Sequence, residues 1–184
     1  MKPFYFILLF ICFIATAQAQ GVKSFKDANN KYGLKDNKGT VIVTPKYNFI
    51  NDFKDGLARV SFGNDYNNWL YGFIDSTGKE VIPLKYSQAD GFCEGLAYVK
   101  LNGKYGFIDR SGKIIIPMIY DNASYFSEGL AAVRTGDYKT GKWAYINKTG
   151  KTILPAQYDA AEAFDNGLAL VSIQGKYGFI NKAG

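Results

Sequence analysis

Histidine is absent from the whole chain of 184 residues. Because histidine is the commonest general acid or base in enzymes and a frequent zinc ligand, its absence excludes Ser-His-Asp and Cys-His catalytic arrangements and most types of zinc site. The recurring Asp-x-x-Gly turns also lack the series of oxygen ligands, spaced two residues apart, that a calcium loop needs. We therefore expect no metal and no other cofactor.

Cysteine is nearly as scarce, with only Cys12 and Cys93. Cys12 lies in an apolar N-terminal run and is not preceded by the small-residue motif of a lipid-modified cysteine. Once that segment is removed, Cys93 has no partner for an intrachain disulfide, even in an oxidising compartment. No activating base accompanies Cys93 in the sequence, so we interpret it as a bystander thiol rather than a nucleophile.

Long hydrophobic runs are missing beyond the N-terminus. Residues 1–19 have the pattern of a secretory signal peptide, with an early lysine, an apolar run over residues 4–14 and a small-residue cleavage site at Ala17-Gln18-Ala19. The run is shorter than the roughly 20 residues that span a bilayer. We therefore expect export to the periplasm, cell surface or medium, with no membrane span after cleavage.

A concentrated positive charge is also lacking. The net charge is +6, and the lysines recur once or twice in each repeat instead of clustering on one segment. Lysines spread in this way are typical of solvated turns, so we expect no nucleic-acid partner.

One sequence pattern recurs in tandem through the rest of the chain. Each copy begins with an aromatic residue and a glycine or alanine, passes through a D-x-x-G-like turn and a P-x-x-Y-like segment, and reaches G-L-A-x-V. The copies start at Tyr32, Tyr71, Tyr105, Trp143 and Tyr177, and the fifth is truncated. A period of roughly 36 residues is typical of stacked or radial repeat folds, so we interpret residues 20–184 as one repeat domain.

Each copy predicts three short strands. In the third copy the first strand covers 105–109, where an aromatic face alternates with a Gly/Ile face; both faces are apolar, so we expect both to be covered. The second strand contains Pro117, which marks an edge, bend or bulge because proline cannot donate to a sheet ladder. The third strand is G-L-A-x-V, and Asn102-Gly103 predicts the tight hairpin that follows such a strand.

These elements predict an all-β fold of tandem antiparallel β-meanders in an open, twisted, solenoid-like array, with a propeller-like ring as the alternative. Open arrays expose sheet edges, which favours self-association. Residues 22–31 supply a third strand leading into Tyr32. Gly184 is the turn glycine of the fifth copy, so either the array continues beyond it or the strand at 177–180 caps the sheet.

The segment G-K-Y-G-F-I-D-R-S-G-K-I-I-I-P-M-I-Y-D, followed by F-S-E-G-L-A-A-V, resembles the WG (KWG) β-repeat of exported bacterial proteins. The resemblance covers residues 31–184. Tyrosine replaces the name-giving tryptophan in most copies, and Trp143 is followed by Ala144 instead of glycine. The resemblance implies a repeat scaffold with a binding role and supplies no catalytic site.

Carboxylates recur in two columns, which are Asp55, Glu94 and Glu128 (Asn166 in the fourth copy) and Asp36, Asp75 and Asp109. Paired carboxylates perform glycoside hydrolysis. Because these acids recur with the repeat, we favour a role in turns and corners.

Aromatic residues form a third column, Tyr32, Tyr71, Tyr105, Trp143 and Tyr177, with Phe73, Phe107, Tyr145 and Phe179 beside it. Aromatics at fixed repeat positions usually pack one copy against the next. We favour this role, with a sugar-stacking platform as the alternative.

Two long loops interrupt the otherwise regular spacing, at residues 63–70 and 135–142. They follow the third strands of alternate copies, so we expect them to emerge from the same edge of the array. Rigid aromatics mixed with adaptable polar residues are typical of binding loops. The candidate partner-binding residues are Tyr66, Trp69, Tyr138 and Lys139.

The leading hypothesis is an exported, non-enzymatic repeat scaffold that binds a protein or an envelope polysaccharide. A structural spacer is one alternative. A carboxylate-based glycosidase is the other, and it is disfavoured because no acidic residue departs from the repeat pattern.

Overall fold

The computed structural model describes residues 21–65 and 68–184 and contains five antiparallel sheets. The first sheet has β1 (Val22–Lys26), β2 (Tyr32–Asp36) and β3 (Val41–Tyr47). The second has β4 (Phe49–Ile50), β5 (Leu57–Phe62), β6 (Leu70–Asp75) and β7 (Glu80–Tyr86). The third has β8 (Gln88–Ala89), β9 (Leu96–Leu101), β10 (Lys104–Asp109) and β11 (Ile114–Tyr120). The fourth has β12 (Asn122–Ala123), β13 (Leu130–Thr135), β14 (Lys142–Asn147) and β15 (Thr152–Tyr158), and the fifth has β16 (Ala160–Ala161), β17 (Ala169–Ile173) and β18 (Lys176–Ile180).

Each sheet combines the end of one sequence copy with the start of the next. The chain leaves the second sheet at the end of β7, and β8 begins at the opposite edge of the third sheet. The three predicted strands per copy are confirmed, and β1 is the predicted strand that leads into Tyr32. A fourth strand, β4, β8, β12 or β16, has only two residues. A two-residue strand is too short to show the alternation of apolar and polar residues by which strands are predicted from sequence.

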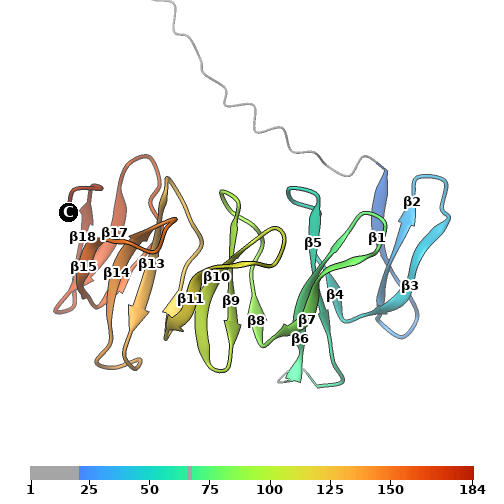
Figure 1. The fold of residues 1–184 in the computed structure, drawn as a ribbon, viewed down its shortest axis with the longest axis horizontal. Coiled ribbons are helices and arrows are strands. Elements are labelled where there is room, and N and C mark those ends of the chain that lie inside the picture. The colour runs from blue at the N-terminus through green and yellow to red at the C-terminus, as the bar shows by residue number, and fades with distance from the viewer. Residues whose placement is uncertain (1–20, 66–67) are drawn as a thin grey trace, which may run out of the picture.

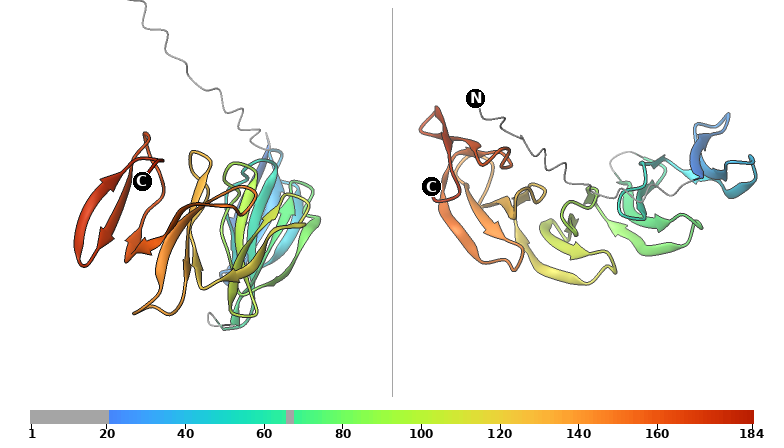
Figure 2. Two further views of the ribbon diagram at one scale, coloured as in Figure 1. Left: turned by 60° about the vertical axis from the view of Figure 1, so that its left-hand side comes forward. Right: turned by 90° about the horizontal axis from the view of Figure 1, so that it is seen from above.

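The sheets stand side by side in a row with β1 and β18 at opposite ends (Figure 1). Seen from above, the row is an open arc (Figure 2, right). The short strands lie on its concave side, whereas the proline-containing strands β7 and β11 lie on its convex side. The structure therefore confirms the open array in place of the ring. No helix in the described ranges is long and apolar enough to cross a membrane.

The proline-containing strands have the edge positions that the prolines predicted. β11 is the outer strand of its sheet, and its register against β10 shifts between the Tyr105–Tyr120 and Phe107–Ile116 pairs, as at a β-bulge. At this level a Cβ built on Gly106 would lie 2.5 Å from the carbonyl oxygen of Ile116. The glycine therefore permits the close approach of the two backbones.

Two-residue hairpin turns precede each G-L-A-x-V strand and also follow those of the second and fourth copies. The predicted Asn102-Gly103 turn has φ angles of 51° and 81°, as a type I′ turn requires. Glu94-Gly95 has the same conformation, with φ angles of 53° and 86°, and the flanking Cys93 and Leu96 exchange backbone hydrogen bonds. The sequence predicted a turn or corner at this position. The structure shows a hairpin in which glutamate occupies a left-handed position that asparagine or glycine usually fills.

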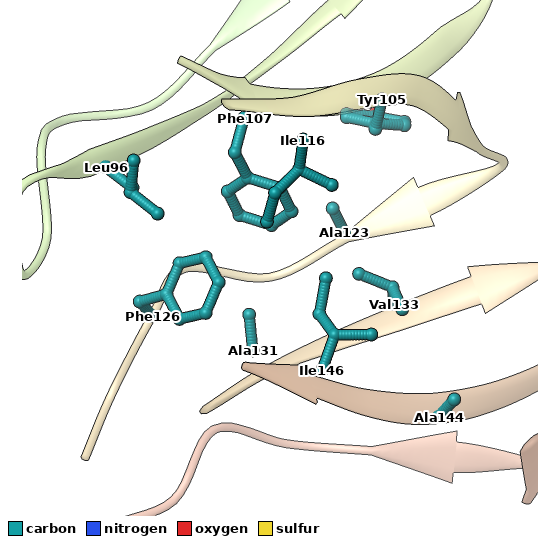
Figure 3. Packing of buried hydrophobic residues seen from close by; sticks show 10 residues of the cluster. All are labelled: Leu96, Tyr105, Phe107, Ile116, Ala123, Phe126, Ala131, Val133, Ala144 and Ile146. Atoms are coloured by element: carbon teal, nitrogen blue, oxygen red, sulfur yellow. The ribbon is translucent and has the colours of Figure 1, made fainter. Parts of the chain in front are cut away.

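Four apolar clusters form the core, one at each junction between successive sheets. Figure 3 shows the junction between the third and fourth sheets, where Phe107 packs against Phe126 with ring centroids 4.8 Å apart. Phe73, Phe107 and Tyr145 are all at most 1 % exposed, which confirms that their column packs copy against copy. Phe179 holds the same position in β18 but is 72 % exposed.

Candidate functional site

The carboxylates of the D-x-x-G turns are used within those turns. Asp109 accepts hydrogen bonds from the backbone N–H groups of Ser111 and Lys113, at 2.9 and 3.0 Å. The Ser111 hydroxyl also donates to it, and this bond lowers the pKa of Asp109 below its usual value. Asp36 and Asp75 make the equivalent backbone contacts.

The second carboxylate column connects neighbouring sheets. Glu128 accepts a hydrogen bond from the backbone N–H of Gly167 at 3.0 Å and forms an ion pair with Lys182 at 2.9 Å. The lysine, together with the N–H group, lowers the pKa of the Glu128 carboxyl. Glu94 makes the same contacts with Gly129 and Lys148 one junction earlier. These carboxylates therefore stabilise the stacking of the sheets.

The two long loops join the central strands of the second and fourth sheets, and both emerge at the lower edge in Figure 1. This agrees with the predicted common edge. Of the four candidate contact residues, Tyr66 lies outside the described residues. Trp69 is half-buried, Lys139 is exposed, and Tyr138 is 87 % exposed.

The loop between β13 and β14 is held by two aspartates. Asp137 accepts hydrogen bonds from the backbone N–H groups of Lys139 and Thr140, at 2.7 and 2.8 Å. Asp121 accepts one from the N–H of Gly136 at 2.9 Å. Hydrogen bonds from Thr140 lower the pKa of Asp137, and the bond from the Lys104 ammonium lowers that of Asp121. The loop thus presents Tyr138 to solvent from a hydrogen-bonded frame.

Arg134 connects this loop to the aromatic column. Its guanidinium carbon lies 5.8 Å from the ring centroid of Tyr138 and 5.6 Å from that of Trp143. Both distances are within the range of cation–π attraction. Sequence reasoning missed Arg134, because the pairing of β13 with β14 brings it opposite Trp143.

A depression of about 390 Å³ lies beside Trp143, and most of its other lining residues lie in the short strands β12 and β16 or directly after β8, β12 and β16. Its lining comes from the third, fourth and fifth sheets and consists of Asp90, Tyr98, Ala123, Ser124, Tyr125, Trp143, Ala161, Glu162 and Ala163. The Tyr125 side chain is 45 % exposed. We refer to this depression as the inner groove.

Two carboxylates accompany the three aromatic rings of the inner groove. Asp90 lies 3.6 Å from the Arg59 guanidinium and accepts a hydrogen bond from Tyr98. Burial, and secondarily the Asp90 charge, raises the pKa of Tyr98 to about 12, so this hydroxyl is a neutral donor at physiological pH. At the other end, Tyr145 donates to the backbone carbonyl of Glu162 at 2.7 Å and fixes the segment that carries its carboxylate.

Sequence reasoning identified Trp143 within an aromatic column but did not identify the inner groove. Tyr125 and Glu162 lie in segments that vary between copies, and such variation was the only available signal. Nowhere in 21–65 or 68–184 do three side chains of histidine, cysteine, aspartate or glutamate group as a metal site would require.

Comparison with protein families shows that a model described as "WG containing repeat" matches residues 32–66, 71–105, 105–138 and 143–177. These four tandem matches begin at the starts assigned from the sequence. A comparison with curated proteins gives no match.

Proposed function

The chain belongs to the WG containing repeat family, and from this premise we propose that it is an exported, non-enzymatic scaffold that binds a macromolecule of the cell envelope. The partner is a protein or an envelope polysaccharide. Contact is made through the concave face and through the long loops at one edge of the array.

The observation that carries this proposal is the presentation of aromatic side chains by rigid backbone. Tyr138 is 87 % exposed on a loop whose backbone N–H groups are bound by Asp137. Trp143 and Tyr125 line the inner groove. Exposed aromatics on a fixed frame supply contact area at a low cost in conformational entropy, which favours binding over a purely structural spacer.

Two features favour binding over catalysis. The recurring carboxylates Glu94 and Glu128 are engaged by backbone N–H groups and lysines of the next sheet, so a second role for them would disrupt the stacking. A histidine that could act as a general base is absent from the sequence.

Export is proposed from the signal-like residues 1–19, which lie outside the described residues. Intact-mass analysis of the protein recovered from its producing cell tests this part of the proposal. We expect a mature chain that starts near Gln20 and that fractionates with the periplasm, cell surface or medium. A full-length chain in the cytoplasm would contradict it.

The binding function is tested by co-sedimentation of the mature protein with insoluble envelope material, before and after that material is stripped of protein. We expect retention, and we expect Tyr138→Ala and Tyr66→Ala to weaken it; unchanged retention of both variants would refute contact through the loops. Retention that survives stripping identifies a glycan partner, whereas retention lost on stripping identifies a protein. No retention would favour the spacer, and release of soluble sugars would favour the glycosidase.

A further inference from the structure

One repeat position carries a large side chain in the first two copies and a small one in the third. Equivalent positions in the first three copies are Arg59, Tyr98 and Ala132, and each faces the next sheet. Arg59 lies over the Tyr71 ring at 5.6 Å and donates to the carbonyl of Ala89 in the next sheet. Its side chain therefore fills the junction between the second and third sheets.

Tyr98 packs against the apolar cluster of the following junction, between the third and fourth sheets, and also lines the inner groove. Its ring lies edge-on to that of Tyr105, with centroids 6.0 Å apart, and its hydroxyl bonds to Asp90. At the junction between the fourth and fifth sheets the corresponding residue is Ala132, whose side chain ends at Cβ. The aromatic residue there is Trp143, the largest in its column.

The fifth sheet contributes Ala161, Ala163 and Glu162, which carries a carboxylate, to the lining of the inner groove. No described side chain forms a hydrogen bond or ion pair with that carboxylate. The inner groove thus combines an accessible indole with an acceptor that is free to bind a ligand.

From this arrangement we propose that the inner groove is a subsite for a pyranose ring of a neutral polysaccharide. The proposal deepens the binding function above and rests on it. The C–H face of a pyranose carries slight positive charge and is attracted to the negative face of an aromatic ring. The carboxylates of Asp90 and Glu162 accept hydrogen bonds from sugar hydroxyl groups at the two ends of the inner groove.

Charge and size select the ligand class. The lining contains two carboxylates, of which Asp90 is paired with Arg59 at 3.6 Å, while Arg134 lies 5.6 Å from the Trp143 ring. The Glu162 carboxylate has no ion-pair partner among the described residues, and its charge disfavours an anionic sugar. The volume of about 390 Å³ is in the lower part of the roughly 300–1,000 Å³ range of small-molecule sites.

The test uses the mature protein with Trp69→Phe, so that Trp143 is the only tryptophan. Titration with a neutral β-1,4-glucose hexasaccharide is followed by tryptophan fluorescence and by calorimetry. We expect a fluorescence change on binding, and affinity at least about tenfold weaker in Trp143→Ala and in Tyr125→Ala, because each removes a stacking ring. Ala163→Phe, which fills the inner groove and retains Trp143, has the same expected effect.

One control variant defines specificity. Tyr71→Ala removes the equivalent ring beneath Arg59 and is not expected to change the affinity for the hexasaccharide. Unchanged thermal unfolding of Tyr125→Ala, whose side chain is partly exposed, excludes misfolding as the cause of a loss. The proposal is overturned if Trp143→Ala, Tyr125→Ala and Ala163→Phe all bind normally. It is also overturned if only a galacturonate hexamer or a cationic peptide binds.

The outcomes separate this proposal from the general binding function. Retention on envelope material without hexasaccharide binding would refute the pyranose subsite and leave the scaffold function intact. Hexasaccharide binding followed by cleavage would support the subsite and refute the non-enzymatic function. Absence of both retention and hexasaccharide binding would refute both.

Discussion

The carboxylate of Glu94 lies 3.1 Å from the backbone nitrogen of Gly129, although the two residues belong to hairpin turns of neighbouring sheets. Glu94 has a φ of 53°, a conformation that costs free energy for a residue with a long side chain. The contact, strengthened by Lys148 at 3.0 Å, offsets that cost. The repeat of this arrangement at Glu128 and Gly167 shows how the turns hold the array together.

We expect Glu94→Ala to lower the free energy of unfolding by about 1 kcal/mol, because it removes one charge-assisted hydrogen bond and one partly exposed ion pair. Urea unfolding followed by far-ultraviolet circular dichroism measures the change. Glu162→Ala, which removes an exposed carboxylate without such partners, is the matched control and should have almost no effect. A double-mutant cycle with Lys148→Ala that gives no coupling would refute the contribution of the ion pair.

The buried and exposed members of the phenylalanine column should differ sharply in their contribution to stability. Phe107 is 0 % exposed and Phe179 is 72 % exposed. We expect Phe107→Ala to cost about 3–5 kcal/mol by leaving a cavity, and Phe179→Ala to cost at most about 0.5 kcal/mol. Equal losses in the same urea titration would contradict the stacking of sheets described above.

Stability should fall in acid. In the folded chain the pKa values of Asp109, Asp121, Asp137 and Glu128 are below the ordinary values of 3.8 for aspartate and 4.5 for glutamate. Groups with a lowered folded pKa contribute stability above their ordinary pKa and lose it as the pH falls through the folded value. We therefore expect the melting temperature to be steady near neutral pH and to decrease below about pH 4.

Asp109→Asn provides the control for this acid sensitivity. Asn147 holds the equivalent position in the fourth copy and accepts the same two backbone hydrogen bonds, each at 3.0 Å. The variant should therefore fold normally at neutral pH and lose less stability in acid than the parent. If the stability of the two proteins fell equally as the pH was lowered, Asp109 would not contribute to the acid sensitivity.

Self-association through a sheet edge remains a prediction, and β18 is the edge that presents the largest exposed rings. Tyr177 and Phe179 are each 72 % exposed on this strand, which pairs with β17 on one side. Unpaired strands with exposed apolar side chains are prone to pair with another chain. Sedimentation velocity over a wide concentration range should detect association that Phe179→Lys reduces; a constant monomer mass would contradict the prediction.

The candidate site was only partly accessible to sequence reasoning. The loop containing Tyr138 was identified because its length departs from the regular spacing of the copies. The inner groove was not identified, since its residues come from three sheets that only the folded chain brings together.

The sequence by itself determined the family, the all-β class, the three principal strands of each copy, the proline edges and the Asn102-Gly103 turn. These follow from local rules, in which period-two alternation, proline and glycine restrict the backbone over a few residues. Tertiary structure alone decided the pairing of half-copies into sheets, the two-residue strands, the contact between Glu94 and Gly129 and the inner groove. Each of these depends on which copy stacks on which, and that is set by burial across junctions between residues roughly one repeat apart.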